Sequence, residues 1–405
     1  YQNEWFNMLY DSNQNNLQET KVNRFIKLKM KILIAADSFK NALGTVEVCH
    51  AIERGCKTGL PKCSTMLFPI ADGGEGTADV IRYHLGYEEV RLKVVDPLFR
   101  PLESTYLIST DQKIAFVELA SASGLELLLE TERNPMISST YGTGMMIMDA
   151  ILRNVKHIIL SIGGSATNDG GIGLASALGY KFLDDHDQPL KGTGSDLLQI
   201  KKIQIEQKVL ETINSVKFEV MCDVINPLYG KNGAAYVYGP QKGADQNMVT
   251  SLDTGLKHLS RVSGEEHLAQ IKGAGAAGGV GFGAMAFLNA SLVSGINTVI
   301  NLTGFEHYVR DADVIITGEG KLDAQTSQGK LIYGICRIAE QYNKPVIALC
   351  GIIDCSPEDI EDLGLITAFS IQRNISSLEE ALSNTAENLE YTASQVIKLI
   401  AISQK

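Results

Sequence analysis

The sequence predicts an α/β protein, in which a doubly wound, mostly parallel sheet domain carries a second α/β domain inserted into it. Three observations support this prediction. Both ends of the chain repeat one pattern, in which an apolar run of strand length leads through a glycine-rich turn into a helix. The middle of the chain has a different pattern, in which short β runs follow one another. A chain of 405 residues is also too long for one ordinary hydrophobic core.

The N-terminal pattern starts after residue 29. Residues 31–36 form a continuous apolar run with the length of a buried strand, and residues 45–57 have helical spacing. A second strand ends at Pro69-Ile70, and the string ADGGEGT then opens a helix that runs toward Leu85. Strand, turn and helix therefore alternate here as in a parallel α/β sheet.

The middle of the chain changes texture. Short β runs at residues 90–95, 104–108 and 114–119 suggest that a different sheet begins near Asp96-Pro97. Two further buried strands are expected at residues 157–162 and 218–222. The second of these strands ends directly before Asp223.

The C-terminal part repeats the N-terminal pattern of apolar strands that alternate with helices. Strands are expected at residues 313–317, 345–349 and 366–371, and helices at 330–342 and 377–402. We therefore predict one domain from residues 30–95 plus 290–405, and an inserted domain over 96–289. Residues 1–29 are rich in Asn and Gln and lack the apolar stretch of a signal peptide, so a disordered or non-native leader is expected there.

Composition narrows the classes of partner. The chain has 47 acidic and 36 basic residues and a formal net charge of -11. Such a charge does not favour binding to nucleic acid or to an anionic membrane. No uninterrupted apolar run approaches the roughly 18 residues of a membrane span. The seven cysteines show no paired spacing, so reduced thiols and a cytoplasmic location are expected. The expected partner is a small molecule, with a homodimer as one possible assembly.

Polar, glycine-rich strings follow strand after strand. They are Asp37-Ser38-Phe39-Lys40, Asp72-Gly73-Gly74, Gly163-Gly164-Ser165, Asp223 and Gly318-Glu319-Gly320. In open α/β sheets ligands bind beyond the carboxyl ends of the strands, and exposed N–H groups at glycine turns form anion sites. The strings therefore suit a phosphate ligand, although each glycine alone is also explained by a tight turn.

Known nucleotide motifs leave two alternatives open. No P-loop, protein-kinase, G-x-S-x-G or H-E-x-x-H motif is present. The string GAGAAG at residues 273–278 fits G-x-G-x-x-G, but residues 265–271 before it read as a helix and no acid lies near position 295. One alternative function is thus a nicotinamide-dependent 2-hydroxy acid dehydrogenase. The other is a non-catalytic protein that binds an organic anion.

Seven strings in order carry a specific resemblance. They are ADSFKNALG (residues 36–44), PIADGGEGT (69–77), GGSATNDGGIG (163–173), CDVINPLYGKNGAA (222–235), GPQKGA (239–244), GAGAAGGVG (273–281) and ITGEGKLDAQTSQGK (316–330). Together they resemble the bacterial type I glycerate kinases from residue 30 to the C-terminal helix. The chain departs from the frequent family pattern at Ala36, Asn41 and Ile225.

The resemblance implies a transferase of the kinase class that is ATP-binding and works with magnesium. Such an enzyme phosphorylates an organic acid, D-glycerate, and the 2-phospho product is favoured over the 3-phospho product. The active site is expected in the cleft between the two domains. Phosphoryl transfer needs positioning, cations that neutralise phosphate charge, and an acceptor for the hydroxyl proton.

Candidate residues follow from these needs. The catalytic candidates are Asp223, Asp37 and Lys40; the substrate-binding candidates are Ser38, Asp72, Gly73 and Gly74. The phosphate or nucleotide cradle is expected at Gly163, Gly164, Ser165, Thr167, Asn168, Gly275 and Gly278, the last two being alternatively a close helix-packing contact. Glu319 and Asp323 are the candidate metal ligands. A helix N-cap role competes for Asp37, Asp72 and Asp169, because each precedes an expected helix.

Overall fold

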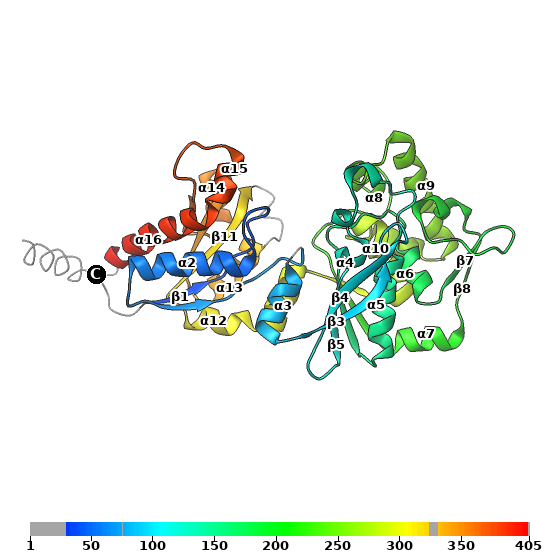
Figure 1. Ribbon diagram of the computed structural model, residues 1–405, viewed down its shortest axis with the longest axis horizontal. Helices are drawn as coiled ribbons and strands as arrows, with labels where there is room; N and C mark the ends of the chain where they lie inside the picture. Colours follow the sequence, from blue (N-terminus) through cyan, green and yellow to red (C-terminus); the bar gives the residue numbers. More distant parts are fainter. Residues whose placement is uncertain (1–29, 75, 324–330, 404–405) are drawn as a thin grey trace, which may run out of the picture. The chain divides into compact units, whose positions relative to one another are not determined.

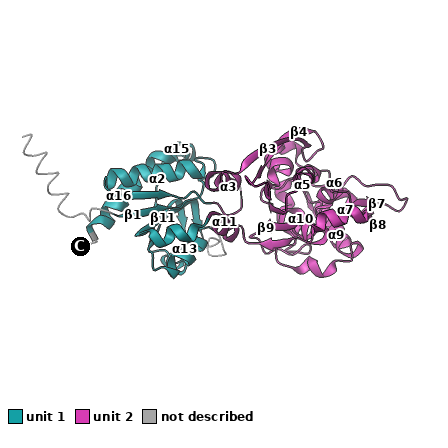
Figure 2. Cartoon of the chain, turned by 90° about the horizontal axis from the view of Figure 1, so that it is seen from below, with its two compact units in different colours: residues 1–70, 304–405 teal, residues 71–303 magenta. Residues whose placement is uncertain are grey.

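The computed structural model describes residues 30–74, 76–323 and 331–403. The chain divides into two compact units, one from residues 1–70 with 304–405 and one from residues 71–303 (Figure 2). The expected leader over residues 1–29 lies outside the described residues. No described helix is both long and apolar enough to cross a membrane.

The first unit is built on a five-stranded parallel sheet. Its strand order is β13-β12-β11-β1-β2. The strands are β1 (Lys31–Ile34), β2 (Ser64–Leu67), β11 (Val314–Asp323), β12 (Val346–Asp354) and β13 (Thr367–Ser370). Every neighbouring pair is parallel. The central strands β1, β11 and β12 are largely buried, as continuous apolar runs predict, whereas the edge strands β2 and β13 are partly exposed.

Helices cover both faces of this sheet. They are α2 (Thr45–Gly59), α12 (Phe305–Asp311), α13 (Leu331–Gln341), α14 (Pro357–Asp362), α15 (Leu378–Ser383) and α16 (Thr385–Ser403). α2 and α16 lie side by side (Figure 1). A Cβ at Gly55 would come within 2.2 Å of the Glu390 carbonyl oxygen, so glycine allows the two backbones to approach.

The second unit contains a six-stranded mixed sheet. Its order is β10-β9-β6-β5-β4-β3, with β3 (Glu88–Val95), β4 (Pro101–Ile108), β5 (Ile114–Glu118), β6 (His157–Ser161), β9 (Lys217–Met221) and β10 (Ser291–Val293). β3, β4 and β5 pair antiparallel, whereas β5, β6, β9 and β10 pair parallel. A separate two-stranded sheet joins β7 (Lys181–Leu183) to β8 (Lys202–Gln204).

The helices of the second unit pack around one apolar core. They are α3 (Thr77–Leu85), α4 (Ala120–Ser123), α5 (Tyr141–Leu152), α6 (Ile172–Ala177), α7 (Gln207–Asn214), α8 (Ala234–Tyr238), α9 (Gln246–Val262), α10 (Ala276–Leu288) and α11 (Gly295–Thr303). Ile158 and Leu160 of β6, Val220 of β9 and Phe282 of α10 are buried in this core. The packing of the sheet against these helices therefore fixes the positions at which the central strands β6 and β9 end.

The structure confirms the α/β fold class and corrects several local expectations. β3 pairs with β4 along its whole length, so the second sheet begins at Glu88 rather than near Asp96. The units divide after Ile70 and before Gly304, not at residues 95/96 and 289/290. Residues 377–402 form two helices, α15 and α16, that meet at Asn384.

The string Gly318-Glu319-Gly320 is not the expected turn, because it lies inside β11. This strand remains paired with β12 as far as Asp323 and Asp354. A Cβ at Gly351 of β12 would come within 2.5 Å of the Gly320 carbonyl oxygen. Glycines here allow two strands to approach closely instead of turning the chain.

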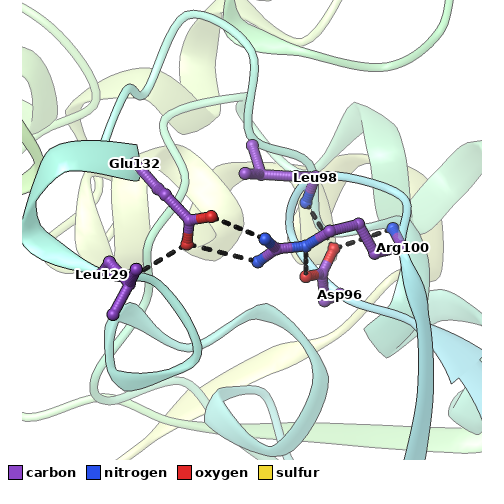
Figure 3. A network of polar contacts seen from close by, with 5 residues as sticks. All are labelled: Asp96, Leu98, Arg100, Leu129 and Glu132. Atoms are coloured by element: carbon purple, nitrogen blue, oxygen red, sulfur yellow. Dashed lines mark hydrogen bonds and ion pairs between the residues drawn. The ribbon is translucent and has the colours of Figure 1, made fainter.

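An ion-pair network fixes the turn between β3 and β4 (Figure 3). Asp96 accepts hydrogen bonds from the backbone N–H groups of Leu98 at 2.8 Å and Arg100 at 2.9 Å, and from Arg100 Nε at 2.5 Å. Arg100 also donates to Glu132 at 2.7 Å, and Glu132 accepts from the Leu129 N–H at 3.1 Å. The guanidinium thereby ties the hairpin to the short 3-10 helix Glu130–Glu132.

Candidate active site

A cavity of about 430 Å³ opens where β6 and β9 end, entirely within the second unit. Its wall consists of Asp72, Gly73, Gly74, Leu125, Ile162, Gly163, Gly164, Ser165, Met221, Cys222, Asp223, Val224, Tyr238, Gln241, Lys242, Ala276 and Ala277. Seven of these residues belong to the polar, glycine-rich strings that follow the expected strands. The cavity therefore lies beyond the carboxyl ends of parallel strands, where α/β proteins bind ligands.

The turn after β6 gives the cavity a pair of exposed glycines. Gly164 has φ of 70°, a left-handed conformation that favours glycine. The segment is held by hydrogen bonds from Leu125 N to Gly164 O at 2.8 Å and from Ala166 N to Ser123 O at 2.9 Å. Among the described residues, the N–H groups of Gly163 and Gly164 have no acceptor. Such N–H groups at a cavity are donors for an anion.

The segment Asp72-Gly73-Gly74 forms the adjacent wall. Asp72 accepts a hydrogen bond from the Gly74 N–H at 2.9 Å, so that N–H is already used and not directed at a ligand. Ser161 Oγ donates to Gly73 O at 2.5 Å. Gly73 has φ of 97°, and a Cβ there would come within 3.0 Å of Gly295 Cα. The two glycines thus allow a tight path that presents Asp72 at the cavity.

Asp223 lies two residues after the end of β9 and reaches the N-terminus of α11. Its two carboxylate oxygens accept hydrogen bonds from the Gly295 N–H at 3.1 and 3.0 Å. The residue as a whole keeps an exposed surface, while its carboxyl group is packed against Gly295. This loss of hydration raises the pKa of Asp223 to about 6; hydrogen bonds from Ser294 and Gly295 lower the pKa, and the charge of Asp72 raises it.

Lys242 is a buried lysine that lines the cavity. It follows the short helix α8, and only 2% of its surface is exposed. Its Nζ donates to Ser165 Oγ and to Thr167 O, both at 2.7 Å. Burial lowers the pKa of Lys242 to about 7, and the charge of Asp169 raises it in part. A cation with two neutral acceptors therefore stands next to the exposed glycines.

Thr167 and Asn168 lie behind the cavity wall rather than on it. Both are fully buried, and among the described residues Thr167 Oγ1 and both Asn168 amide atoms have no hydrogen-bond partner. Asp169 is also buried, but Thr140, Gly171 and Gly173 donate to it. Only the first three residues of the cradle expected over residues 163–168 line the cavity, and of these Gly163 and Gly164 are exposed.

Gly275 and Gly278 do not line the cavity, although Ala276 and Ala277 between them do. A Cβ at Gly275 would lie 2.2 Å from Pro227 O, and one at Gly278 would lie 2.0 Å from Thr167 O. The structure therefore places both glycines in close backbone packing, which is the alternative that the sequence left open for them.

The remaining candidates lie in the first unit, at the ends of β1 and in β11. Asp37 N donates to Gly318 O at 2.9 Å, and Ser38 N donates to Asp37 Oδ1 at 2.6 Å. Lys40 is exposed in the following turn. Glu319 and Asp323 are residues of β11, and Lys321 pairs with Asp354 at 2.8 Å and with Asp323 at 3.6 Å. α2 begins at Thr45, as expected, with Gly44 at its N-cap position, so Asp37 does not cap this helix.

No group of three or more His, Cys, Asp or Glu side chains that could hold a metal ion occurs within the described residues. The cavity wall nevertheless presents two carboxylates, Asp72 and Asp223, close enough for the charge of Asp72 to affect Asp223. Mg²⁺ binds through one or two carboxylates plus substrate phosphates and waters. The donor set at the cavity fits such an ion.

Lys242 is the cavity residue that sequence reasoning missed, together with Tyr238 and Gln241. All three lie in or next to the string GPQKGA at residues 239–244, where a lysine is enclosed by turn residues. The position of this lysine between two glycines was the available signal. Its burial depends on packing against Ser165 and Thr167, which are about 75 residues away in sequence.

The fold and the cavity together define a class: an α/β protein whose strand ends present anion donors, a buried lysine and two carboxylates to a small ligand. Comparison with known proteins then gives the family. The sequence profile described as the glycerate kinase family matches residues 32–401. The chain belongs to the glycerate kinase family, whose members are enzymes of the kinase class.

Relatives match over nearly the whole chain. A protein named glycerate kinase from Halalkalibacterium halodurans is 44% identical over 368 residues, covering 90% of this chain and 97% of the relative. One named glycerate 2-kinase from Escherichia coli is 38% identical, covering 93% and 99%. A crystal structure described as a glycerate kinase 2 from Salmonella typhimurium LT2 is 39% identical, covers 93% and 99% and superposes with a TM-score of 0.81. The resemblance to glycerate kinases is thereby confirmed.

Proposed function

We propose that this chain transfers the γ-phosphoryl group of ATP to D-glycerate and that the 2-hydroxyl is the acceptor. Membership of the glycerate kinase family supports the substrate, and the name of the Escherichia coli relative, glycerate 2-kinase, supports the position. The observation that carries the proposal is the cavity wall itself. It combines donors for an oxyanion, at Gly163, Gly164 and Lys242, with a carboxylate of raised pKa at Asp223.

Asp223 is the proposed acceptor of the hydroxyl proton. A general base works best when its pKa lies near the operating pH, and the pKa of Asp223 is raised from the ordinary aspartate value of 3.8 to about 6. At neutral pH the carboxylate is ionised yet more basic than an ordinary aspartate. The Gly295 N–H holds it in place without taking away all its lone pairs.

Asp72 is the proposed carboxylate ligand of Mg²⁺, with Asp223 next to it. When bound, the ion neutralises phosphate charge and orients the transferred group. Gly163 and Gly164 would donate to the same phosphate or to the substrate carboxylate. Roles for Asp37, Ser38, Lys40, Glu319 and Asp323 of the first unit stay predictions, as do the interdomain position of the active site, a homodimer and a cytoplasmic location.

The dehydrogenase alternative gains no support from the structure. The string at residues 273–278 follows the 3-10 helix Glu266–Gln270 rather than a strand. The Thr167 backbone fills the space beside Gly278, so a pyrophosphate cannot approach this glycine. A dinucleotide fingerprint needs a strand before its glycines and free backbone at them.

The test is turnover by the purified chain. ADP formation from ATP should rise when D-glycerate is added and should require Mg²⁺, as followed by a coupled assay. Phosphorus NMR of the product should show the phosphate on the 2-position. If ADP formation does not respond to D-glycerate, the proposal is wrong; a 3-phospho product would contradict only the position. Reduction of a nicotinamide cofactor by D-glycerate would favour the dehydrogenase instead.

A further inference from the structure

Lys242 has surroundings that ordinary structural lysines lack. A lysine is almost never fully buried unless a negative charge pairs with it. Among the described residues Lys242 forms no ion pair; its contacts are a hydroxyl and a backbone carbonyl, and Asp169 acts on it only through its charge. An ammonium group has three N–H donors, and these two contacts use two of them. One donor remains on a residue that lines the cavity.

We propose that Lys242 is the cationic binding residue of the cavity and that it takes an oxyanion of the substrates, together with the Gly163 and Gly164 N–H groups. This inference rests on the proposed function, because it names the group that binds the anion in that same site. Ser165 Oγ and Thr167 O hold the ammonium group at the wall, so binding needs no reordering of a flexible side chain. The ligand would supply the negatively charged partner that the Lys242 ammonium group lacks within the described protein.

Two substrate groups share this chemistry, the carboxylate of the hydroxy acid and a phosphoryl group of the nucleotide. Asp72 and Asp223 lie on the same cavity wall and repel a bare anion unless a metal ion intervenes. Lys242 and the glycine pair therefore make the part of the wall that favours an oxyanion without a metal. Measurements with D-glycerate and with ADP separate the two sources.

The protonation state of Lys242 should make ligand affinity depend on pH. Its charged and titratable surroundings are Asp169 behind it, Arg133 beside Gly243, Tyr238 of α8, Asp245 at the start of α9, and Cys222, Asp223 and Asp72 on the cavity wall. Only the protonated lysine binds an anion. Because burial lowers the pKa of Lys242 to about 7, affinity should be highest below pH 7 and fall by up to tenfold per pH unit above it. An ordinary exposed lysine would stay charged throughout this range.

The experiment compares Lys242→Met and Lys242→Arg with the wild type, and Lys208→Met is the matched control. Lys208 is an exposed lysine of α7, so its replacement removes the same charge from the same unit. Titration calorimetry with Mg²⁺ gives the dissociation constants for D-glycerate and for ADP between pH 6 and 9. Melting temperatures show that each variant is folded.

The expected result is a dissociation constant about 10- to 100-fold higher in Lys242→Met for one of the two ligands, as for loss of a hydrogen bond from a charged group. Weaker D-glycerate binding identifies the carboxylate, and weaker ADP binding identifies a phosphoryl group. The decline above pH 7 should be present in wild type, absent in Lys242→Met, and flat in Lys242→Arg, whose guanidinium stays protonated. Lys208→Met should match wild type.

Unchanged affinities for both ligands in folded Lys242→Met, with a flat wild-type profile, would overturn the inference. A wild type that shows no D-glycerate-dependent ADP formation would instead overturn the proposed function. The two failures are distinguishable, because the first is measured on a wild type already shown to turn over D-glycerate.

Discussion

The turns after β6 and β9 carry one aspartate each, and the two carboxylates are held very differently. Asp169, after β6, is buried and accepts hydrogen bonds from the Thr140 N–H and hydroxyl and from the Gly171 and Gly173 N–H groups. Asp223, after β9, lines the cavity and accepts from the Gly295 N–H. Both residues lie in a connection that follows a central strand of the same sheet, Asp223 two residues after β9 and Asp169 eight residues after β6.

The difference lies in how the lone pairs are used. The protein surrounds Asp169 with donors, so this carboxylate ties α5, α6 and the turn before α6 together and has little capacity left for a ligand. Asp223 has fewer partners and lies on the cavity wall; burial raises the pKa of both carboxyl groups, and that of Asp223 to about 6. A carboxylate that is short of donors and adjacent to a cavity is suited to chemistry, whereas a saturated one is suited to structure.

Asp223→Asn should produce the largest effect and tests the chemical half of this comparison. The amide keeps the shape but loses the charge and basicity needed in the transition state. We expect kcat to fall by about 10²–10⁴-fold, roughly 3–5 kcal/mol of barrier, with the KM for glycerate and the melting temperature changed little. Steady-state kinetics and thermal melts on the same preparation measure both.

Near-normal turnover in a folded Asp223→Asn variant would contradict the catalytic role. It would leave Asp223 as the cap of α11, where its contacts with Gly295 already place it. The proton acceptor would then have to be sought at Asp37 or Asp323. A lower melting temperature with kcat per folded molecule preserved would give the same conclusion.

Asp169→Asn should do the reverse. One carboxylate oxygen becomes an NH₂ group that faces N–H or O–H donors in a buried site, and the donors lose their acceptor. A buried donor left without a partner costs about 1–3 kcal/mol, so we expect the free energy of unfolding to fall by about 2–4 kcal/mol. Urea unfolding measures this loss, and kcat per folded molecule should stay within about threefold of wild type, well short of the 10²-fold losses of general-base removal.

The contrast fails if Asp169→Asn folds with wild-type stability but loses turnover. In that case the buried carboxylate would act through Lys242, whose pKa it raises. The pH dependence of D-glycerate affinity tests this route, because without the Asp169 charge the decline should lie at lower pH, and an unshifted decline would exclude an effect through Lys242.

Much of the fold was accessible from the sequence because buried strands leave continuous apolar runs. The strands expected at residues 31–36, 114–119, 157–162 and 218–222 correspond to β1, β5, β6 and β9 within one or two residues. The three-residue strands β7, β8 and β10 are too short to give a periodic signal. β11 was expected to stop at Gly318 because glycine favours turns, but β12 offers a pairing partner as far as Asp354. Such pairing depends on a second segment and is not visible in either string alone.

The candidate site was predictable in its residue types but not in its assembly. The structure brings Asp72, Gly73, Gly74, Gly163, Gly164, Ser165 and Asp223 onto one cavity wall. Glycine strings at 275 and 278 look the same in sequence, yet neighbouring backbone fills the space that a ligand would need. Lys242 was missed because its place between two glycines does not by itself distinguish a buried lysine from a solvated one. Burial is a property of the packed fold, so it lies beyond a pattern of residue types.

The smallest expected effect concerns the Asp96–Arg100–Glu132 network (Figure 3). None of these three residues lines the cavity. Like Asp169, Asp96 is a nearly buried carboxylate surrounded by donors, so it belongs to the structural half of the comparison. Arg100→Met keeps the aliphatic stem but leaves Asp96 and Glu132 without their shared cation. We expect the melting temperature to fall by about 2–4 °C, with kcat and the KM for glycerate unchanged.

Arg91→Met is the matched control for this prediction. Arg91 lies on β3 and pairs with Glu89 at 2.8 Å, but 70% of its side chain is exposed and that of Glu89 is 28% exposed, compared with 8% for Asp96. Exposed pairs are screened by water and contribute little to stability, so its melting temperature should change by less than about 1 °C. Equal shifts in the two variants would show that Arg100 contributes only as an exposed charge. A larger shift in Arg100→Met that persists in high salt would show that the saturated Asp96 carboxylate sets the effect, because charge pairs with a buried partner are screened much less than exposed ones.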